Sequence, residues 1–456
     1  MIGKKLMLIC APVSSRSGYG DHARDLVTSF IEHDKYEVHV MDVPWGSCPR
    51  NALDENITEH QKISNCILKE PNLDRQPDIY VDIRIPNEFQ TYGKYNIGIT
   101  AGIETTIVSE AWIEGCNKMD LVIVPSEHSK EGFIKSIYDK VQNLPNGKQQ
   151  KIGELKLEKP IEVLFEGADE DIYKPIDNVS LELIDDIKEN FCFLHVGMWG
   201  KGGFGEDRKD ISKLVKIFYE SFANKKEKPA LILKTNGASF SILDREECLS
   251  KIKQVKNMFP QDWDLPNVYL LHGSLSSAEM NKLYNHSKVK SFISLTHGEG
   301  FGRPLLEATM TGLPVIASGW SGHMDFLDTN NSILLGGDLK PVPNSQHWKD
   351  IIVNGSEWFE VNENLTYKSL NYSFENEKII KEKSKNLMIA NRNKFTLKNM
   401  ISELDNIVQK HINESPQQVP INLNLPKLKK VDEKETSTPK INLPKLKNVN
   451  KEEVSV

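Results

Sequence analysis

Thr296-His-Gly-Glu-Gly-Phe-Gly-Arg-Pro-Leu-Leu-Glu-Ala308 is the stretch that decides the fold of this 456-residue chain. Gly300 and Gly302 form a Gly-x-Gly turn within it, and the absence of side chains lets the backbone bend tightly and approach a ligand closely. Pro304 suits the first turn of a helix, because its φ is already right and no amide donor is missed. We therefore expect the amides of residues 301–305, except that of Pro304, to point into a cleft at the positive end of a helix, which is a site that suits phosphate.

Two carboxylates, Glu299 and Glu307, lie on either side of this turn. An ionised carboxylate only accepts hydrogen bonds, and its two oxygens can hold the two hydroxyls of a vicinal diol. One Glu before the turn and one inside the helix suit a ligand with a diol at each end of a diphosphate, and a nucleotide sugar has that layout. Two plainer interpretations stay open here. Gly-rich strand-to-helix turns are common, and Glu307 could be an ordinary first-turn Glu favoured by the helix dipole.

The order of elements around the stretch favours the nucleotide-sugar interpretation. A buried-type strand at residues 291–295 precedes it, a helix follows at residues 304–311, and Gly312 ends that helix before another buried strand at residues 315–317. In this order the segment resembles the E-x(7)-E signature of family 4 retaining glycosyltransferases, which have the two-domain GT-B fold.

Length and charge limit the class of protein. A chain of 456 residues is too long for one core, so about two domains are expected. The net charge is −7, with acidic and basic residues interspersed, which argues against a nucleic-acid-binding protein, since one would show a basic excess on at least one domain. Local basic patches would still suit a charged acceptor or a membrane surface.

The cysteines and the N-terminus indicate a reduced, cytoplasmic setting. The six cysteines are scattered without a C-x-x-C pair, and Cys10 and Cys192 lie in strand-like apolar runs, where we expect small buried hydrophobic residues. The N-terminal apolar run is short and is interpreted as a first strand rather than a signal peptide. No apolar stretch approaches the roughly 18 residues needed to span a membrane.

The first half of the chain alternates between strands and helices. A strand at residues 4–13, a helix at residues 21–31 with Asp21 as its N-cap, and a strand at residues 36–43 form a βαβ unit. This alternation predicts a parallel sheet with helices on both faces. Pro145-Asn-Gly147, among the polar residues 140–159, predicts a turn or a short hairpin. The other elements expected here are strands at residues 79–83, 95–100, 121–124 and 161–165 and helices at residues 110–118 and 130–137.

The second half repeats the pattern. Residues 166–175 carry Gly, acidic residues and Pro, which is typical of an interdomain crossing. The elements expected after it are strands at residues 191–196, 230–234, 268–271, 291–295, 315–317 and 333–335 and helices at residues 211–222, 244–258, 277–285, 304–311 and 323–327.

We therefore predict an α/β protein with two doubly wound, Rossmann-like domains that face each other across a cleft. Residues 1–170 form the acceptor-side domain, and residues 171–374 form the donor-side domain. The resemblance implies that C-terminal helices, at residues 375–412, rejoin the first domain.

A compositional change marks residues 413–456. Asn424-Leu-Pro-Lys-Leu-Lys-Lys-Val431 recurs 18 residues later as Asn442-Leu-Pro-Lys-Leu-Lys-Asn-Val449. This segment is too polar and too short for a core, so we predict a disordered tail. The repeat is either duplicated filler or a pair of short motifs that bind a protein partner with avidity.

The diphosphate leaving group needs cations. The resemblance implies an Arg and a Lys near the start of the helix after the strand at residues 191–196, and Arg208 and Lys209 are the candidates. The chain departs from the usual spacing here, because Met198 stands where the family often has Arg and a Gly-rich loop, residues 200–205, is inserted. Lys201 is an alternative. Cations are unfavourable at a helix start, which strengthens the case for a phosphate partner over two solvated charges.

The resemblance also implies the remaining donor contacts. Glu307 should hold the ribose diol and Glu299 the hydroxyls of the donor sugar. Gly273 and Leu275, after the strand at residues 268–271, are candidates for contacts with the base, whereas His272 is interpreted as structural. The residues implied along the phosphates are Gly300, Phe301, Gly302 and Arg303.

The first domain contributes candidates on the acceptor side. Gly18 and Gly20 resemble the family's Gly-rich loop, although a plain strand-to-helix turn would also carry them. Glu104 stands where many family members have a His that faces the donor sugar, so it could orient the sugar, bind the acceptor or cap a helix. In the second domain, His323 and Asp325 could touch the sugar, and Asp325 could equally be a cap.

The sequence as a whole therefore predicts a glycosyltransferase that moves a hexose-type sugar from a nucleotide-diphosphate sugar to an acceptor hydroxyl with retention. No cofactor and no metal are expected, because the D-x-D at residues 262–264 lacks the strand context of a metal site and the basic side chains can neutralise the diphosphate. The alternatives are a catalytically silent nucleotide-sugar or glycan-binding scaffold and a GT-B nucleotide-sugar epimerase. The base, the sugar and the acceptor are not specified by the sequence.

Overall fold

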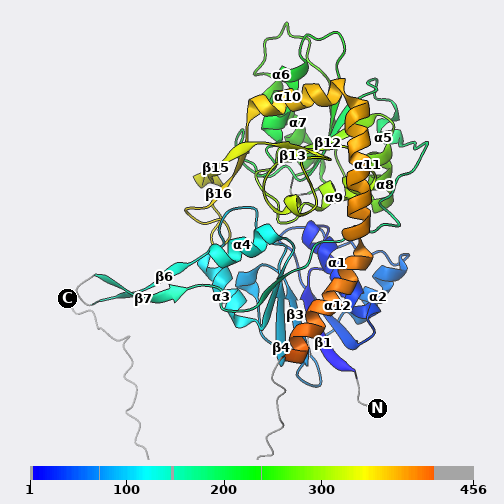
Figure 1. Ribbon diagram of the computed structural model, residues 1–456. Helices are drawn as coiled ribbons and strands as arrows, with labels where there is room; N and C mark the ends of the chain where they lie inside the picture. Colours follow the sequence, from blue (N-terminus) through cyan, green and yellow to red (C-terminus); the bar gives the residue numbers. More distant parts are fainter. Residues whose placement is uncertain (1–3, 71, 145–147, 238, 415–456) are drawn as a thin grey trace, which may run out of the picture. The chain divides into compact units, whose positions relative to one another are not determined.

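Two six-stranded parallel sheets, one in each half of the chain, form the framework of the computed structural model (Figure 1). The structure describes residues 4–70, 72–144, 148–237 and 239–414. The predicted tail therefore lies outside the described residues except for positions 413 and 414, and so do Pro145-Asn-Gly147.

The first sheet has the strand order β2-β1-β3-β4-β5-β8. β1 is buried from Leu6 to its end, and such a nearly continuous apolar run is typical of a parallel strand covered on both faces. The strands are β1 (Lys5–Ala11), β2 (Tyr36–Asp42), β3 (Ile79–Ile83), β4 (Tyr95–Ile99), β5 (Leu121–Val124) and β8 (Ile161–Val163), and the helices are α1 (Gly18–Glu32), α2 (Thr58–Cys66), α3 (Glu110–Lys118) and α4 (Glu127–Lys135).

The second sheet has the order β11-β10-β9-β12-β13-β14, with α6 to α9 in the segments between its strands. Its strands are β9 (Cys192–Val196), β10 (Ala230–Lys234), β11 (Val268–Leu271), β12 (Val289–Ser294), β13 (Val315–Ser318) and β14 (Ile333–Leu335), and its helices are α5 (Glu182–Asp185), α6 (Ile211–Phe222), α7 (Ile242–Lys256), α8 (Ser277–Asn285), α9 (Arg303–Met310) and α10 (Glu363–Glu375). The prediction of two doubly wound halves is confirmed.

Two antiparallel hairpins stand beside the sheets. The hairpin predicted within residues 140–159 is confirmed as β6 (Tyr138–Asn143) and β7 (Gln149–Leu155). The second hairpin, β15 (Gly337–Pro341) and β16 (Glu357–Val361), was not predicted, and neither were α2 and α10. The short 3-10 turns are η1 (Pro86–Glu88), η2 (Gly322–Asp325) and η3 (Asn344–Gln346), and η2 replaces the helix expected at residues 323–327.

The predicted start of α1 is wrong. The helix begins at Gly18, and its N-cap is Ser17, whose Oγ accepts a hydrogen bond from the Gly20 amide at 3.0 Å. Asp21 lies in the first turn and pairs with Arg24. α4 likewise begins earlier than predicted, at Glu127.

Two C-terminal helices, α11 (Glu377–Lys394) and α12 (Leu397–Glu414), pack against different halves of the chain (Figure 1). α11 packs against α9, and α12 packs against α1. Their junction is fixed next to the point where the chain leaves the first sheet, because the Ala168 amide donates to the Phe395 carbonyl at 3.0 Å and the Leu397 amide donates to the Ala168 carbonyl at 2.8 Å. The exact domain boundaries stay a prediction.

No helix in these described ranges is both long enough and apolar enough to cross a bilayer. The six cysteines are all free, and Cys10 and Cys192 are buried, as predicted.

The contact of α12 with the first sheet gives a stability prediction. Leu404 is fully buried in the core of the first half. Leu404→Ala should lower the free energy of unfolding by about 3 kcal/mol, since both apolar transfer energy and packing are lost. Denaturant unfolding would measure it, with the exposed Ser402→Ala in the same helix as a control that changes the energy by less than about 0.5 kcal/mol. A similar small effect for Leu404→Ala would show that α12 is not an integral part of the first half.

Candidate functional site

Each sheet has one switch point, where the direction of its strand order reverses. In the second sheet the order reverses between β9 and β12, and in the first between β1 and β3. Ligands of open α/β sheets bind at such switch points. The segment after β9 carries Arg208 and Lys209, and the segment after β12 carries Glu299. The topology thus brings together residues 90 positions apart in sequence.

The Gly-x-Gly turn needs its glycines for different reasons. Gly302 is the N-cap of α9 and has a φ of +98°, which is strained for any residue with a side chain. A Cβ on Gly300 would lie 2.0 Å from the Ala101 carbonyl oxygen, so only glycine fits against the first half of the chain. The Gly300 carbonyl accepts a hydrogen bond from Ser126 Oγ at 2.6 Å, which joins the two halves at this turn.

The amides at the start of α9 form part of the expected site. Within the described part of the chain, the amides of Phe301, Gly302 and Arg303 have no hydrogen-bond acceptor. The prediction for Leu305 is wrong, because its amide donates to the Gly302 carbonyl at 2.9 Å and closes the first turn of α9. The Phe301 side chain is buried in the core, so only its backbone is available to a ligand.

Glu299 lies in a buried cluster with two cations. Its Oε1 accepts a hydrogen bond from Lys209 Nζ, and its Oε2 lies 3.1 Å from Arg208 Nη1. Burial by itself would raise the pKa of Glu299, but the charges of Lys209 and Arg208 outweigh burial and hold that pKa well below its usual range. Burial lowers the pKa of Lys209, and Glu299 opposes that effect. The structure therefore brings together three of the four predicted catalytic residues as an ionised cluster.

The fourth, Glu104, reaches this cluster from the first half. Its Oε1 lies 3.6 Å from Arg208 Nε, and its side chain is 39% exposed. Arg208 thus lies between a buried and a half-exposed carboxylate. The alternative cation, Lys201, is exposed in the Gly-rich loop.

The backbone of Arg208 rests on the residues just before Glu299. The Arg208 carbonyl accepts hydrogen bonds from the His297 amide at 2.8 Å and from Thr296 Oγ1 at 3.3 Å. His297 is fixed in turn, because its Nδ1 lies 2.7 Å from the Phe359 carbonyl and its ring stacks on Trp358 at 4.2 Å. The unpredicted strand β16 therefore supports the loop that carries the cations.

Glu307 is held by Tyr284, which the sequence did not single out, and by Arg303, which it did. Tyr284 donates to its Oε2 at 3.2 Å, and Arg303 Nε donates to its Oε1 at 3.2 Å. Arg303 Nη1 lies 2.5 Å from Asp25 Oδ2 on α1, so its guanidinium bridges the two halves. Burial raises the pKa of Glu307, and burial also raises the pKa of the nearby Glu166 to about 7.

The segment after β11 has the open backbone expected for contacts with a base. Gly273 has a φ of +115° with no atom near its missing side chain, and its carbonyl accepts from Lys234 Nζ at 2.6 Å. Leu275 is half-buried against the core. His272 Nε2 lies 2.7 Å from Asp244 Oδ2, in agreement with its interpretation as structural.

Tyr19 ties two loops of the first half to each other. Gly18 and Gly20 lie in the first turn of α1, where Gly18 is exposed and Gly20 packs on the Ser15 carbonyl. Tyr19 between them accepts from the Ala101 amide at 3.0 Å and lies 2.8 Å from Thr100 Oγ1. The loop that leads to Glu104 is therefore tied to the Gly-rich turn.

His323 and Asp325 have structural partners. His323 is fully buried with its Nε2 2.6 Å from the Ser318 carbonyl. Asp325 Oδ2 accepts from the Glu127 amide at 3.0 Å, so it caps α4 in the other half of the chain rather than its own turn. Among the described residues, no group of three or more His, Cys, Asp or Glu is arranged to hold a metal ion.

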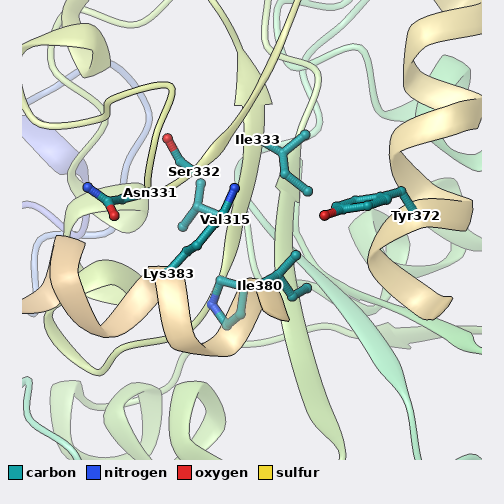
Figure 2. Close-up of a pocket in the computed structure, with 8 residues that line it drawn as sticks. Val315, Asn331, Ser332, Ile333, Tyr372, Ile380 and Lys383 are labelled. Carbon is teal, nitrogen blue, oxygen red and sulfur yellow. The ribbon is translucent and has the colours of Figure 1, made fainter. Parts of the chain in front are cut away.

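A separate pocket lies at the other end of the strands of the second sheet (Figure 2). Val315 and Ile333, which begin β13 and β14, line it together with Tyr372 and Lys383. It is therefore at the amino ends of the strands, away from the cluster around Glu299.

Comparisons with known proteins agree with the fold described above. Residues 210–352 match the family model described as glycosyl transferases group 1. The chain is similar in structure to sucrose-phosphate synthase from Thermosynechococcus elongatus, with a TM-score of 0.60 and 11% identity over 91% of this chain and 100% of that one. Comparison with curated protein sequences gives no match.

Two further solved structures resemble the chain. HepE of Anabaena in complex with UDP and glucose has a TM-score of 0.55 and 13% identity over 89% of this chain and 100% of that one. A glycosyltransferase from Rickettsia africae has a TM-score of 0.56 and 14% identity over 91% and 100% of the two chains. These similarities show that the fold is GT-B.

The buried pair of Lys209 and Glu299 gives a prediction. Lys209→Met should lower the free energy of unfolding by about 3 kcal/mol, because it leaves Glu299 with less compensation for its buried charge. The double variant Lys209→Met/Glu299→Gln should regain part of that loss in denaturant unfolding. Lys216→Met, which breaks two partly exposed ion pairs of α6, with Glu220 and Glu363, is the control and should cost less than about 1 kcal/mol. Additive losses in the double variant would mean that the two residues do not stabilise each other.

Proposed function

We propose that the chain transfers a hexose-type sugar from a nucleotide-diphosphate sugar to an acceptor hydroxyl; the match of residues 210–352 to the model described as glycosyl transferases group 1 and the GT-B fold support this proposal. The observation that carries this proposal is the buried cluster of Lys209, Arg208 and Glu299 at the switch point of the second sheet. Cations and free amides at the carboxyl ends of neighbouring strands suit a diphosphate, and the adjacent carboxylate suits sugar hydroxyls.

The diphosphate is proposed to bind between the cations and the start of α9. Lys209 and Arg208 neutralise its charge, and the free amides of Phe301, Gly302 and Arg303 donate to its oxygens. Phosphate oxygens then replace Glu299 as partners of the cations. Glu299 becomes free to accept hydrogen bonds from hydroxyls of the donor sugar.

The ribose and the base of the nucleotide are proposed to contact separate groups. Glu307 is proposed to hold the ribose diol, and the open backbone at Gly273 with the half-buried Leu275 to receive the base. HepE, which shares the fold, was solved with UDP and with UDP-glucose, so a uridine nucleotide is the first donor to test.

The acceptor is proposed to enter from the first half. Glu104 reaches Arg208 from that side, and Gly18 and Gly20 stand at the switch point of the first sheet. Contact between the halves at Gly300 and Ser126 would exclude water and so suppress hydrolysis of the donor. Retention at the anomeric carbon is part of the proposal and rests on the E-x(7)-E resemblance.

No cofactor or metal is needed in this proposal, since Lys209, Arg208 and the amides of α9 supply the positive charge that the leaving group requires. The reduced cysteines agree with a cytoplasmic site of action.

A thermal-shift screen against UDP-, GDP- and ADP-glucose, followed by an assay of nucleoside diphosphate release with a panel of acceptors, tests this function. One nucleotide class should stabilise the protein, by about 2.7 kcal/mol at 100 times its dissociation constant. Glu299→Gln should lower transfer at least about 100-fold, because it removes a charge that orients the sugar. Lys216→Met, on the outer face of α6, should keep wild-type turnover.

Three results would contradict the proposal. Wild-type turnover by Glu299→Gln would remove Glu299 from the reaction. Binding without release of nucleoside diphosphate across the acceptor panel would indicate a silent binding protein. A changed sugar nucleotide formed without acceptor would indicate an epimerase.

A further inference from the structure

We propose that Asp25, on α1, is a positioning residue for the donor: it draws Arg303 away from Glu307, so that Glu307 keeps acceptor capacity for the ribose diol. This inference rests on the proposed function, in which Glu307 holds that diol. It adds a residue from the first half of the chain to a binding site in the second.

The geometry shows one guanidinium shared by two carboxylates. Arg303 Nη1 lies 2.5 Å from Asp25 Oδ2, whereas Arg303 Nε lies 3.2 Å from Glu307 Oε1. The Arg303 and Asp25 side chains are each only 19% exposed, and Glu307 is 10% exposed, so water screens these charges poorly. The shorter contact is the one to Asp25.

Glu307 has few free acceptor positions. Its two oxygens offer about four lone-pair sites. Tyr284 donates to one oxygen and Arg303 to the other, and the Tyr173 side chain also interacts with Glu307, so a vicinal diol must compete for the positions that are left. A second hydrogen bond from Arg303 would therefore compete directly with the ribose.

Arg303 is placed to become that competitor. It lies four residues before Glu307 on α9, a spacing that favours pairing along one helix face. A guanidinium can donate two parallel hydrogen bonds to a single carboxylate. With Asp25 neutralised, nothing of comparable charge at contact distance would hold Nη1 away from Glu307 in the described structure.

Two other acidic residues act on the charge of Arg303 but do not take the place of Asp25. Glu166 is buried within the electrostatic reach of Arg303, yet burial raises its pKa to about 7, so it is partly protonated near neutral pH. Asp21 is half-exposed and pairs with Arg24. Asp25 alone makes the direct contact from α1.

The arrangement links donor affinity to contact between α1 and α9. If the two halves separate, Arg303 loses Asp25 and turns to Glu307, which weakens the ribose site. Donor release and opening would then favour each other, since coupling between two equilibria is reciprocal.

Calorimetry with two ligands tests whether Asp25 acts on the ribose diol through Arg303 and Glu307. The probe is whichever of UDP, GDP and ADP binds the wild type, together with its 2′,3′-dideoxy analogue, which lacks the diol. Asp25→Asn should weaken binding of the ribonucleotide about tenfold, the loss of about one charge-assisted hydrogen bond, and leave binding of the dideoxy analogue unchanged. Arg303→Lys should show the same pattern, because one ammonium on α9 cannot serve both carboxylates. Asp21→Asn, one turn earlier on α1, is the matched control and should bind both ligands as the wild type does.

The outcomes separate the inference from the proposed function. Wild-type affinity of Asp25→Asn and Arg303→Lys for the ribonucleotide would overturn the inference alone. Equal weakening for both ligands would also overturn it, because the effect would not pass through the diol. If the wild type binds none of the three nucleotides, the proposed function fails and the inference fails with it.

Discussion

A buried carboxylate with two cations around it, Glu299 between Lys209 and Arg208, is the interaction on which the rest of the site depends. Glu299 and Lys209 are withdrawn from water, whereas Arg208 is partly exposed, and buried charges are stable only when they are compensated. In the proposed function, a diphosphate takes the place of Glu299 beside the cations. The same charges that keep Glu299 ionised in the folded protein would then hold an anionic donor.

The fold brings this cluster together through strand order. β9 and β12 are neighbours although their sequences are far apart, and the segments that follow them carry the cations and the carboxylate. The loop with the cations is supported by His297, which β16 fixes through Phe359. Gly300 leaves room for the first half of the chain to pack closely here. From that half, Ser126 contacts the Gly300 carbonyl and Glu104 lies beside Arg208.

Local pattern was enough to predict the sheets and most of their helices, because buried parallel strands and amphipathic helices are marked by apolar periodicity. Local pattern failed where contacts between distant parts of the chain determine the secondary structure. α1 starts at Gly18, where the Ser17 side chain caps the helix and Gly20 lies close to the Ser15 carbonyl, whereas glycines argue against a helix locally. The strand β15 is exposed along its length and is defined only by its partner β16. The E-x(7)-E pattern indicated Glu299 and Glu307, but the partner of Arg303 lies 278 positions away, and no spacing could indicate it.

A crystal structure of the protein with UDP-glucose would test the central claim most directly. The account predicts phosphate oxygens at about 3 Å from Lys209 Nζ and from the amides of Phe301 to Arg303, with Glu299 turned to the sugar hydroxyls. A nucleotide bound elsewhere, with the pair of Lys209 and Glu299 intact, would contradict it.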